Sequence, residues 1–400
     1  MFSKRLGIYP IRFGNQLEFI QSGNPFFSKL ESLIHNATDE IHFQMYIFDP
    51  DKTGEIILQA LIDAAHRGVK IYVVLDAYGS KNLHHTWQKR FMDAGIELYF
   101  YSPIKFGNYL HMGMRMHHKI ICIDKQFALL GGINVSDNYS CYSNQIPWLD
   151  FALLAHGKVV NDLWQVCRST LKKVKKQKQT NLFKTQTPEL VVEDKAIKVR
   201  VLQNNWLQAK IGITKQYKQQ IRKAEKQITL FASYFIPSLA LKRLLKKAAK
   251  HGVQVNIVLG SISDVGLVKH ASEYLYDDLL RSGINLYEWN KSVLHAKVAT
   301  IDDHWVCVGS YNLNHLSDFG SIECNLEIED EAFCTQTQTT LLKMIKDDCK
   351  KVSLKQFQKR TNPFLKIYNA CSYGLMRLML NMLFFLQSRN SKKIRYIKFD

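Results

Sequence analysis

The chain repeats itself, and this duplication limits its possible folds more than any other feature. Three segments of the first half recur in the second half with the same order and similar residue patterns. The matched pairs are Ala37–Ile41 with Ala224–Ile228, Ala64–Ile71 with Ala248–Val255, and Ala94–Tyr99 with Ser282–Tyr287. The copies lie 184 to 188 residues apart. This near-constant offset predicts two structurally equivalent halves with small insertions.

Each half alternates apolar runs with segments whose apolar residues have helical spacing. Residues 41–48 and 69–76 are typical of buried strands, and residues 55–68 between them are typical of a helix. Such alternation predicts an α/β fold with helices packed on a sheet. With 400 residues, 46% of them hydrophobic, the chain is long enough for two or three domains with a substantial core.

We predict four regions along the chain. Residues 1–167 form a first domain, 168–195 a basic linker, 196–350 a second domain and 351–400 a carboxyl-terminal tail. The linker begins with one arginine and five lysines between positions 168 and 179, without any acidic residue. Such a charge run is typical of a solvated helix or linker, and contact with anionic lipid or nucleic acid is the alternative.

The tail contains a strongly apolar segment, residues 363–386, in which polar residues recur at roughly helical spacing. These polar residues are Lys366, Asn369, Ser372, Arg377 and Asn381. A basic segment, residues 392–398, follows. We expect an amphipathic helix that lies in a membrane interface. Packing on the protein's own core is the alternative, and spanning is least favoured because Arg377 and Asn381 would lie near mid-membrane.

The charge balance indicates an anionic partner. Lys and Arg number 54 against 35 Asp and Glu, a formal charge of +19, which suits nucleic acid or anionic lipid headgroups. Pro10, Arg12 and Gly14 interrupt the amino terminus where a secretory signal would be apolar. The eight cysteines include no CxxC pair, which favours reduced thiols in a cytoplasmic protein over a zinc site or disulfides.

Two segments carry the residues expected to do chemistry. Both read HxKx4D followed by GxxN, and the asparagine stands 17 positions after the histidine in each. The residues are His117, Lys119, Asp124 and Asn134 in the first segment, and His295, Lys297, Asp302 and Asn312 in the second. In a strand, side chains two residues apart project from one face, so each histidine and its lysine point the same way.

The two aspartates fall on the opposite strand face or at the strand end. We therefore interpret Asp124 and Asp302 as structural, with direct catalysis as the less favoured interpretation. Gly131 and Gly132 in one half, and Gly309 and Ser310 in the other, keep side-chain bulk away so that the asparagines can direct their amide donors to a ligand.

Two histidines, two lysines and two asparagines together would form an anion site with groups that titrate near neutrality. This set suits attack on a phosphodiester, with one neutral imidazole as nucleophile and the other, protonated, as general acid. The lysines and asparagines would stabilise the non-bridging oxygens. We expect no metal and no cofactor, because no cluster of metal ligands is evident in the sequence.

Each imidazole also needs an acceptor that orients its other nitrogen. Asp150 and Glu323 follow the asparagines and begin the last apolar strand of each half, so they are the predicted orienting acids. Glu327 is a less favoured alternative to Glu323. A solvated acid at a strand start is the competing interpretation for both positions.

These motifs resemble the phospholipase D superfamily over roughly residues 15 to 350. The segments GVKIYVVLDAYGS, RMHHKIICIDKQFALLGGIN and VLHAKVATIDDHWVCVGSYNLN look like bacterial cardiolipin synthases of the phospholipase D type, in the short form without amino-terminal transmembrane helices. The resemblance implies two α/β/α domains related by a pseudo-twofold axis, with one shared active site. It also implies a phosphatidyl-histidine intermediate that an alcohol resolves, with His117 as nucleophile and His295 as general acid.

The resemblance further implies a phosphatidyl transfer to phosphatidylglycerol. We expect anionic phospholipids as partners, phosphatidylglycerol first and phosphatidylethanolamine as a further candidate, at the cytoplasmic side of the bacterial cell membrane. Nucleic acid is a less favoured partner, although a nuclease of the same superfamily would also use the +19 charge. A hydrolytic phospholipase D or a phosphatidylserine synthase would also fit the paired motifs.

Overall fold

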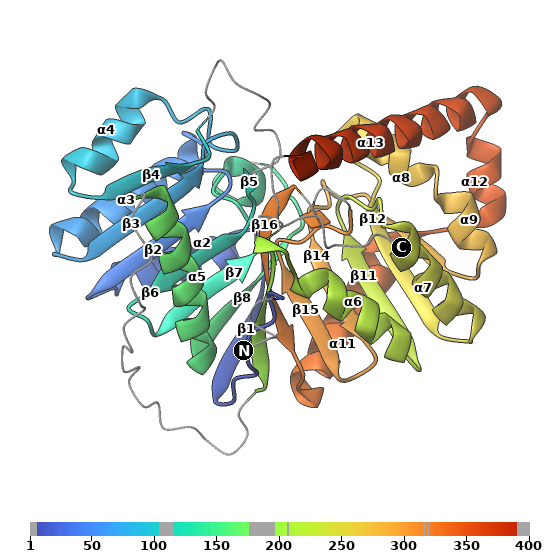
Figure 1. Cartoon of the computed structure of the whole chain (residues 1–400), viewed down its shortest axis with the longest axis horizontal. Coiled ribbons are helices and arrows are strands. Elements are labelled where there is room, and N and C mark those ends of the chain that lie inside the picture. The colour runs from blue at the N-terminus through green and yellow to red at the C-terminus, as the bar shows by residue number, and fades with distance from the viewer. Residues whose placement is uncertain are drawn as a thin grey trace.

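The chain folds into two α/β halves that lie side by side (Figure 1). The computed structural model describes residues 6–103, 115–143, 145–175, 197–205, 208–314, 317–318 and 320–389. The first half contributes one sheet with its helices, and the second half contributes a larger sheet with its own helices.

The first half alternates strands and helices as its repeat pattern predicts. Its strands are β1 (Asn15–Gln21), β2 (Glu40–Met45), β3 (Lys70–Asp76), β4 (Glu97–Tyr101), β6 (Lys119–Ile123), β7 (Phe127–Gly131) and β8 (Phe151–Gly157). Its helices are α2 (Asn24–His35), α3 (Lys52–His66), α4 (His85–Asp93), α5 (Lys158–Val174) and the short 3-10 turn η1 (Asp137–Tyr139).

The second half repeats this series and adds elements at its edges. Its strands are β9 (Val199–Asn205), β10 (Lys210–Ile211), β11 (Gln227–Ala232), β12 (Gln254–Gly260), β13 (Asn285–Trp289), β14 (Lys297–Ile301), β15 (Trp305–Gly309), β16 (Ser321–Ile328) and β17 (Cys349–Val352). Its helices are α6 (Gly212–Lys223), α7 (Leu239–Lys250), α8 (Gly266–Glu273), α9 (Tyr276–Arg281), α11 (Glu331–Asp348), α12 (Leu354–Arg360) and α13 (Pro363–Arg389).

Both sheets have the same strand order. The first runs β1-β8-β7-β6-β2-β3-β4, and the second contains β9-β16-β15-β14-β11-β12-β13 with β10 and β17 at its ends. In each sheet three strands are parallel, namely β2-β3-β4 and β11-β12-β13, and their helical crossovers cover the sheet. The predicted fold class, two duplicated α/β domains with a helical carboxyl-terminal tail, is confirmed.

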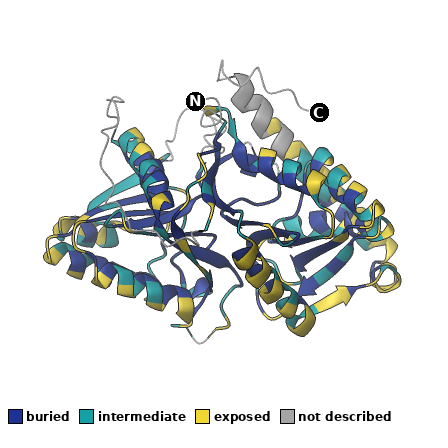
Figure 2. Cartoon of the chain, turned by 90° about the horizontal axis from the view of Figure 1, so that it is seen from below, coloured by how far each residue is buried: buried dark blue, intermediate teal, exposed yellow. Residues whose placement is uncertain are grey.

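The two halves share a hydrophobic core. One cluster of buried side chains joins Leu153 and Val160 of the first half to Val298 and Leu326 of the second half. Separate clusters lie between each sheet and its own helices. Figure 2 shows the sheets as largely buried and the outer helix faces as exposed. Each sheet therefore packs one face against the helices of a separate cluster, while its other face joins helices α5 and α11 in the shared core between the halves.

The chain also crosses between the halves outside this core. The backbone of residues 7–12 pairs with β9, where the Tyr9 N–H donates to the Val201 carbonyl at 3.0 Å. The two-residue strand β5 (Arg115–Met116) pairs with β16. Helix α5 continues to Val174, so the start of the predicted linker is helical, whereas linker residues 176–195 lie outside the described residues. The domain division at 167 and 196 stays a prediction.

Candidate active site

The two motif histidines meet at the junction between the halves, where each pairs with the opposite half. The His117 N–H donates to the carbonyl of Ile322 on β16 at 3.0 Å, and the His295 N–H donates to the carbonyl of Leu149 at 2.8 Å. Glu323 directly follows Ile322, and Asp150 directly follows Leu149. The backbone pairing thus places each histidine beside an acid from the other repeat.

Both imidazoles contact these acids through Nδ1. His117 Nδ1 lies 3.0 Å from Glu323 Oε2, and His295 Nδ1 lies 2.6 Å from Asp150 Oδ2. Both carboxylates are fully buried. A carboxylate on Nδ1 fixes the ring and its tautomer, which directs Nε2 toward a substrate. Glu327, the alternative to Glu323, instead contacts Arg200 and the indole N–H of Trp305.

Charges around the first pair favour a carboxylate at Glu323. Burial by itself raises the pKa of Glu323, but the charges of His117 and Lys119, with hydrogen bonds from His117 and Ser310, lower it to about 2. Burial lowers the pKa of His117, and Lys119 adds to this effect while Glu323 opposes it. Burial therefore favours the neutral form of the His117 imidazole, which is the form that a nucleophile requires.

The second pair also favours a neutral ring in the unliganded site. Burial, and next the charge of Lys297, lower the pKa of His295 to about 4, while Asp150 opposes the shift. The negative charge of a bound phosphodiester would favour protonated His295 and raise this pKa. Substrate binding and protonation of His295 are therefore expected to be coupled.

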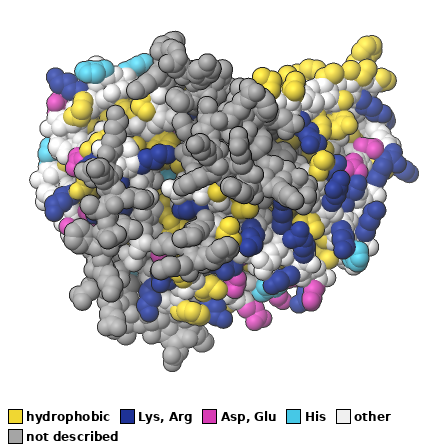
Figure 3. Space-filling model, in the orientation of Figure 1, with side chains coloured by type: hydrophobic (Ala, Val, Ile, Leu, Met, Phe, Trp, Pro, Cys, Tyr) yellow, Lys and Arg dark blue, Asp and Glu magenta, His cyan; other side chains and the backbone are white. Residues whose placement is uncertain are grey.

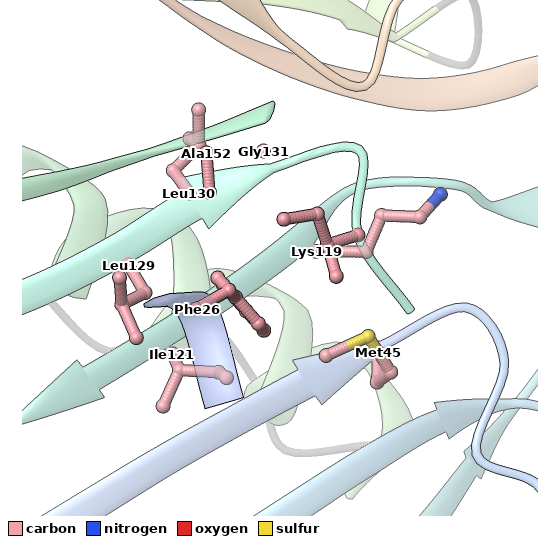
Figure 4. Close-up of a pocket in the computed structure, with 9 residues that line it drawn as sticks. Phe26, Met45, Lys119, Ile121, Leu129, Leu130, Gly131 and Ala152 are labelled. Carbon is pink, nitrogen blue, oxygen red and sulfur yellow. The ribbon is translucent and has the colours of Figure 1, made fainter. Parts of the chain in front are cut away.

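The two lysines are buried close to the histidines. The Nζ atom of Lys119 donates to the His117 carbonyl at 2.6 Å, and that of Lys297 donates to Asp150 Oδ2 at 3.4 Å. Burial and the neighbouring charge of Lys297 lower the pKa of Lys119 to about 7. Figure 4 shows the Lys119 nitrogen pointing away from the apolar side chains, among them Ile121, that line a small cavity beside its stem. An anion between the ammonium groups would relieve their mutual repulsion.

The two motif asparagines are held by the strand ends of their own halves. Asn134 Oδ1 accepts from the Ile47 N–H at 3.1 Å, and Asn312 Oδ1 accepts from Ser233 Oγ at 2.6 Å. Asn134 Nδ2 donates to the Tyr139 hydroxyl at 3.0 Å. These bonds fix the orientation of the amides, and their contact with a phosphate stays a prediction.

The two motif aspartates lie away from the histidines, at hairpin turns where both have left-handed backbone conformations. Asp124 accepts hydrogen bonds from the backbone N–H groups that lead into β2, and Asp302 does the same for β11. Distances are 2.8 to 3.0 Å. This geometry favours the structural interpretation of both residues over direct catalysis.

The aromatic side chains around the imidazoles were not predicted from the sequence. The ring of Tyr46 lies 4.8 Å from that of His117, and the rings of Tyr139 and Tyr234 lie 5.3 and 6.1 Å from that of His295. Tyr46 and Tyr234 each follow a repeated strand and precede a proline, so the duplication itself contained a signal for them.

The small residues of the motifs also lie against the two acids. A Cβ at Gly132 would lie 2.3 Å from Asp150 Oδ2. Ser310 at the equivalent position donates from Oγ to Glu323 Oε2 at 2.5 Å, and Ser321 Oγ donates to the other carboxylate oxygen at 2.6 Å. The small residues at these positions therefore also determine how closely each acid is packed and hydrogen-bonded, which was not predicted from the sequence.

The arrangement combines two imidazoles, each anchored through Nδ1, with two buried lysines. It can attack a phosphodiester with one Nε2 and protonate the leaving oxygen with the other. Within the described ranges no three His, Cys, Asp or Glu side chains are grouped in a way that could hold a metal ion.

Comparisons with known proteins agree with this chemistry. The family model described as "Cardiolipin synthase, PLD-like domain" matches residues 30–145 and 217–345. Cardiolipin synthase B of Salmonella typhi is 32% identical over 353 residues, which cover 88% of this chain and 85% of that protein. The minor cardiolipin synthase of Bacillus subtilis (strain 168) is 28% identical, covering 87% of this chain and 85% of its own.

Solved structures share the fold at low sequence identity. A phosphatidylserine synthase of Haemophilus influenzae has a TM-score of 0.70 at 15% identity and covers 95% of this chain and 98% of its own. A polyphosphate kinase of Porphyromonas gingivalis has a TM-score of 0.59 at 14% identity and covers 92% of this chain and 53% of its own. At these identities the likeness concerns the fold alone.

Proposed function

The chain belongs to the cardiolipin synthase family of phospholipase D-like proteins, and we propose that it transfers a phosphatidyl group from one phosphatidylglycerol to a hydroxyl of another. The products would be cardiolipin and glycerol. The observation that carries this proposal is the pair of imidazoles, each held through Nδ1 by a buried acid of the opposite half. Two separately oriented rings suit a reaction that forms and then breaks a covalent bond to phosphorus.

In the first step, His117 Nε2 attacks phosphorus and a P–N bond forms. The P–O bond to the glycerol headgroup breaks, and the leaving oxygen takes a proton from His295. Lys119 and Lys297 stabilise the charge on the non-bridging oxygens. Glu323 stabilises the positive charge that develops on His117, since its own pKa of about 2 keeps it ionised.

In the second step, neutral His295 takes the proton from a hydroxyl of the second phosphatidylglycerol. That oxygen attacks phosphorus, the P–N bond breaks and His117 is released as a neutral imidazole. Atoms and protons balance over the two steps. The aromatic rings of Tyr46 and Tyr234 flank the histidines and would limit the access of water, which would otherwise yield phosphatidic acid.

The test is mass spectrometry of lipids after purified protein is incubated with vesicles of phosphatidylglycerol and phosphatidylethanolamine. We expect cardiolipin with the wild type and none with His117→Ala or His295→Ala, both of which should keep the fold and the vesicle binding. Phosphatidic acid alone would identify a hydrolase. An unchanged lipid profile would contradict the proposal and direct attention to nucleic-acid phosphodiesters.

The assignment of the nucleophile is tested separately. Protein is mixed with phosphatidylglycerol labelled at phosphorus, quenched in base and digested for peptide mapping. We expect the label on the peptide that contains His117. A label on the His295 peptide would exchange the two roles and leave the transferase proposal in place.

A further inference from the structure

Helix α13 packs its polar side against the protein. Asn369 and Ser372 are buried, and Asn369 Oδ1 lies 2.9 Å from His270 Nδ1 of α8. The ring of Tyr373 stacks on that of Tyr274, just beyond α8, with centroids 4.7 Å apart. These contacts fix the rotation of α13 about its axis. In Figure 1 the helix runs from α12 at the outer edge toward the junction between the halves.

This rotation leaves an apolar stripe uncovered. Six large side chains of α13 are each at least 48% exposed, and Phe364 reaches 84%. They are Phe364, Ile367, Tyr368, Leu375, Leu378 and Met382. Their spacing of mostly three, four or seven residues places them on one face of the helix over a length of roughly 27 Å. Figure 3 shows hydrophobic side chains gathered along this edge of the molecule.

The stretch of sequence that contains the stripe is basic. Between positions 349 and 399 the sequence contains twelve Lys and Arg residues and no Asp or Glu. Lys366 is exposed on α13 itself. An uncovered apolar stripe within a strongly basic segment suits a surface that is apolar inside and anionic at its headgroups, which is an anionic phospholipid bilayer.

Helix α13 is linked to the candidate active site through α8, on which its covered face packs. Helix α8 begins two residues after Asp264, whose carboxylate accepts from the Tyr234 hydroxyl at 2.7 and 2.9 Å. The ring of Tyr234 lies 6.1 Å from that of His295. Helix α8, on which α13 packs, therefore starts at the sheet edge where the His295 side of the site lies. Among the described residues no helix has the length and apolar character needed to cross a bilayer.

We infer that the exposed stripe of α13 lies in the surface of an anionic phospholipid bilayer and holds the His295 side of the site against it. The inference rests on the proposed function, because it names the source of the lipid substrate. It also assigns the interface to one face of the helix, which the sequence pattern alone left open.

The first test uses an existing cysteine. Cys371 is exposed on α13, and Cys141 is exposed in the first half. The Cys141→Ser protein is labelled at Cys371 with a polarity-sensitive fluorophore, and the Cys371→Ser protein is labelled at Cys141 as the control. With vesicles rich in phosphatidylglycerol we expect a blue shift and an intensity gain of at least twofold at Cys371 only. An unchanged signal at Cys371 would overturn the inference.

The second test removes the stripe. The triple variant Leu375→Ser, Leu378→Ser, Met382→Ser changes exposed side chains, and a matched triple variant changes Ile11, Met92 and Ile146, which are exposed elsewhere. Vesicle flotation should show at least a tenfold loss of binding for the first variant and none for the second. Equal binding by both, or a dimer in light scattering that only the stripe variant loses, would contradict the inference.

Activity assays separate this inference from the proposed function. The stripe variant should convert vesicle phosphatidylglycerol at least tenfold more slowly than wild type, yet convert dispersed short-chain phosphatidylglycerol at the wild-type rate. A wild type that binds vesicles through α13 but produces no cardiolipin from either substrate would refute the proposed function and leave the docking surface intact.

Discussion

Gly132 and Ser310 occupy the same position of the two repeats, but they act differently on the acids beside them. Gly132 leaves room for Asp150, whereas Ser310 donates a hydrogen bond to Glu323. Glu323 thus accepts a hydrogen bond from Ser310 that Asp150 cannot receive from Gly132, which has no side chain. This difference supplies a physical basis for distinct roles of His117 and His295 in an otherwise duplicated arrangement.

The first prediction concerns Gly132→Ala. The added methyl would overlap Asp150, so this carboxylate must move away from His295 Nδ1. We expect kcat to fall by about 10²- to 10⁴-fold because the ring loses its orienting partner. The measurement is cardiolipin formation under saturating lipid. Gly266→Ala, where a methyl would meet open space, is the control and should keep wild-type activity. A Gly132→Ala enzyme with unchanged kcat would show that Asp150 does not position His295.

At the scale of elements, each hairpin turn is connected to the start of a neighbouring strand. Asp302 lies in the turn after β14 and accepts from three successive N–H groups that lead into β11. Asp124 does the same between β6 and β2. These bonds fix the strands that present the lysines of the motifs, and they explain why an aspartate at this spacing accompanies each histidine.

We therefore expect Asp302→Ala to lower the free energy of unfolding by about 1–3 kcal/mol, since three partly buried backbone N–H groups lose their charged acceptor. The kcat of the folded fraction should stay within about threefold of wild type. Urea denaturation and lipid assays on the same preparation measure both quantities. Asp303→Ala is the neighbouring control, because its exposed pair with Lys226 contributes little. A loss of kcat without loss of stability would instead support a catalytic Asp302.

At the scale of the whole molecule, burial of histidines makes stability depend on pH. Burial lowers the pKa of His42 and His118 to about 3 and, with the charge of Lys297, that of His295 to about 4. Their ordinary value in an unfolded chain is about 6.5. Between these values the unfolded chain binds protons that the folded chain does not, so the unfolded state gains stability as the pH falls.

We expect the free energy of unfolding to decrease from pH 6.5 toward pH 4, with each such histidine contributing about 1.4 kcal/mol per pH unit. His42→Phe keeps the ring packing against Tyr72 and removes one titrating group, so its slope should be shallower by one such contribution. Urea denaturation at a series of pH values measures the slope. An identical slope in wild type and variant would mean that the pKa of His42 is not lowered in the folded protein.

The duplication, the alternation of strands and helices, and the identity of the two motifs could all be predicted from the amino-acid sequence. These features depend on local or repeated patterns. In any strand, side chains two residues apart project from the same face, so each histidine lies beside its lysine independently of the tertiary fold. The two acids that we propose to orient the histidines could also be named from the sequence, since Asp150 and Glu323 stand close to the starts of β8 and β16.

Which acid meets which histidine depends on the tertiary fold and could not be predicted. The backbone of His117 pairs with β16 and that of His295 pairs beside Leu149, so each acid crosses to the opposite half. The covered face of α13 is likewise decided by tertiary contacts. His270 of α8 contacts Asn369, and the ring of Tyr274 stacks on that of Tyr373. Both outcomes depend on contacts between residues about 100 to 200 positions apart, which no local pattern in a sequence specifies.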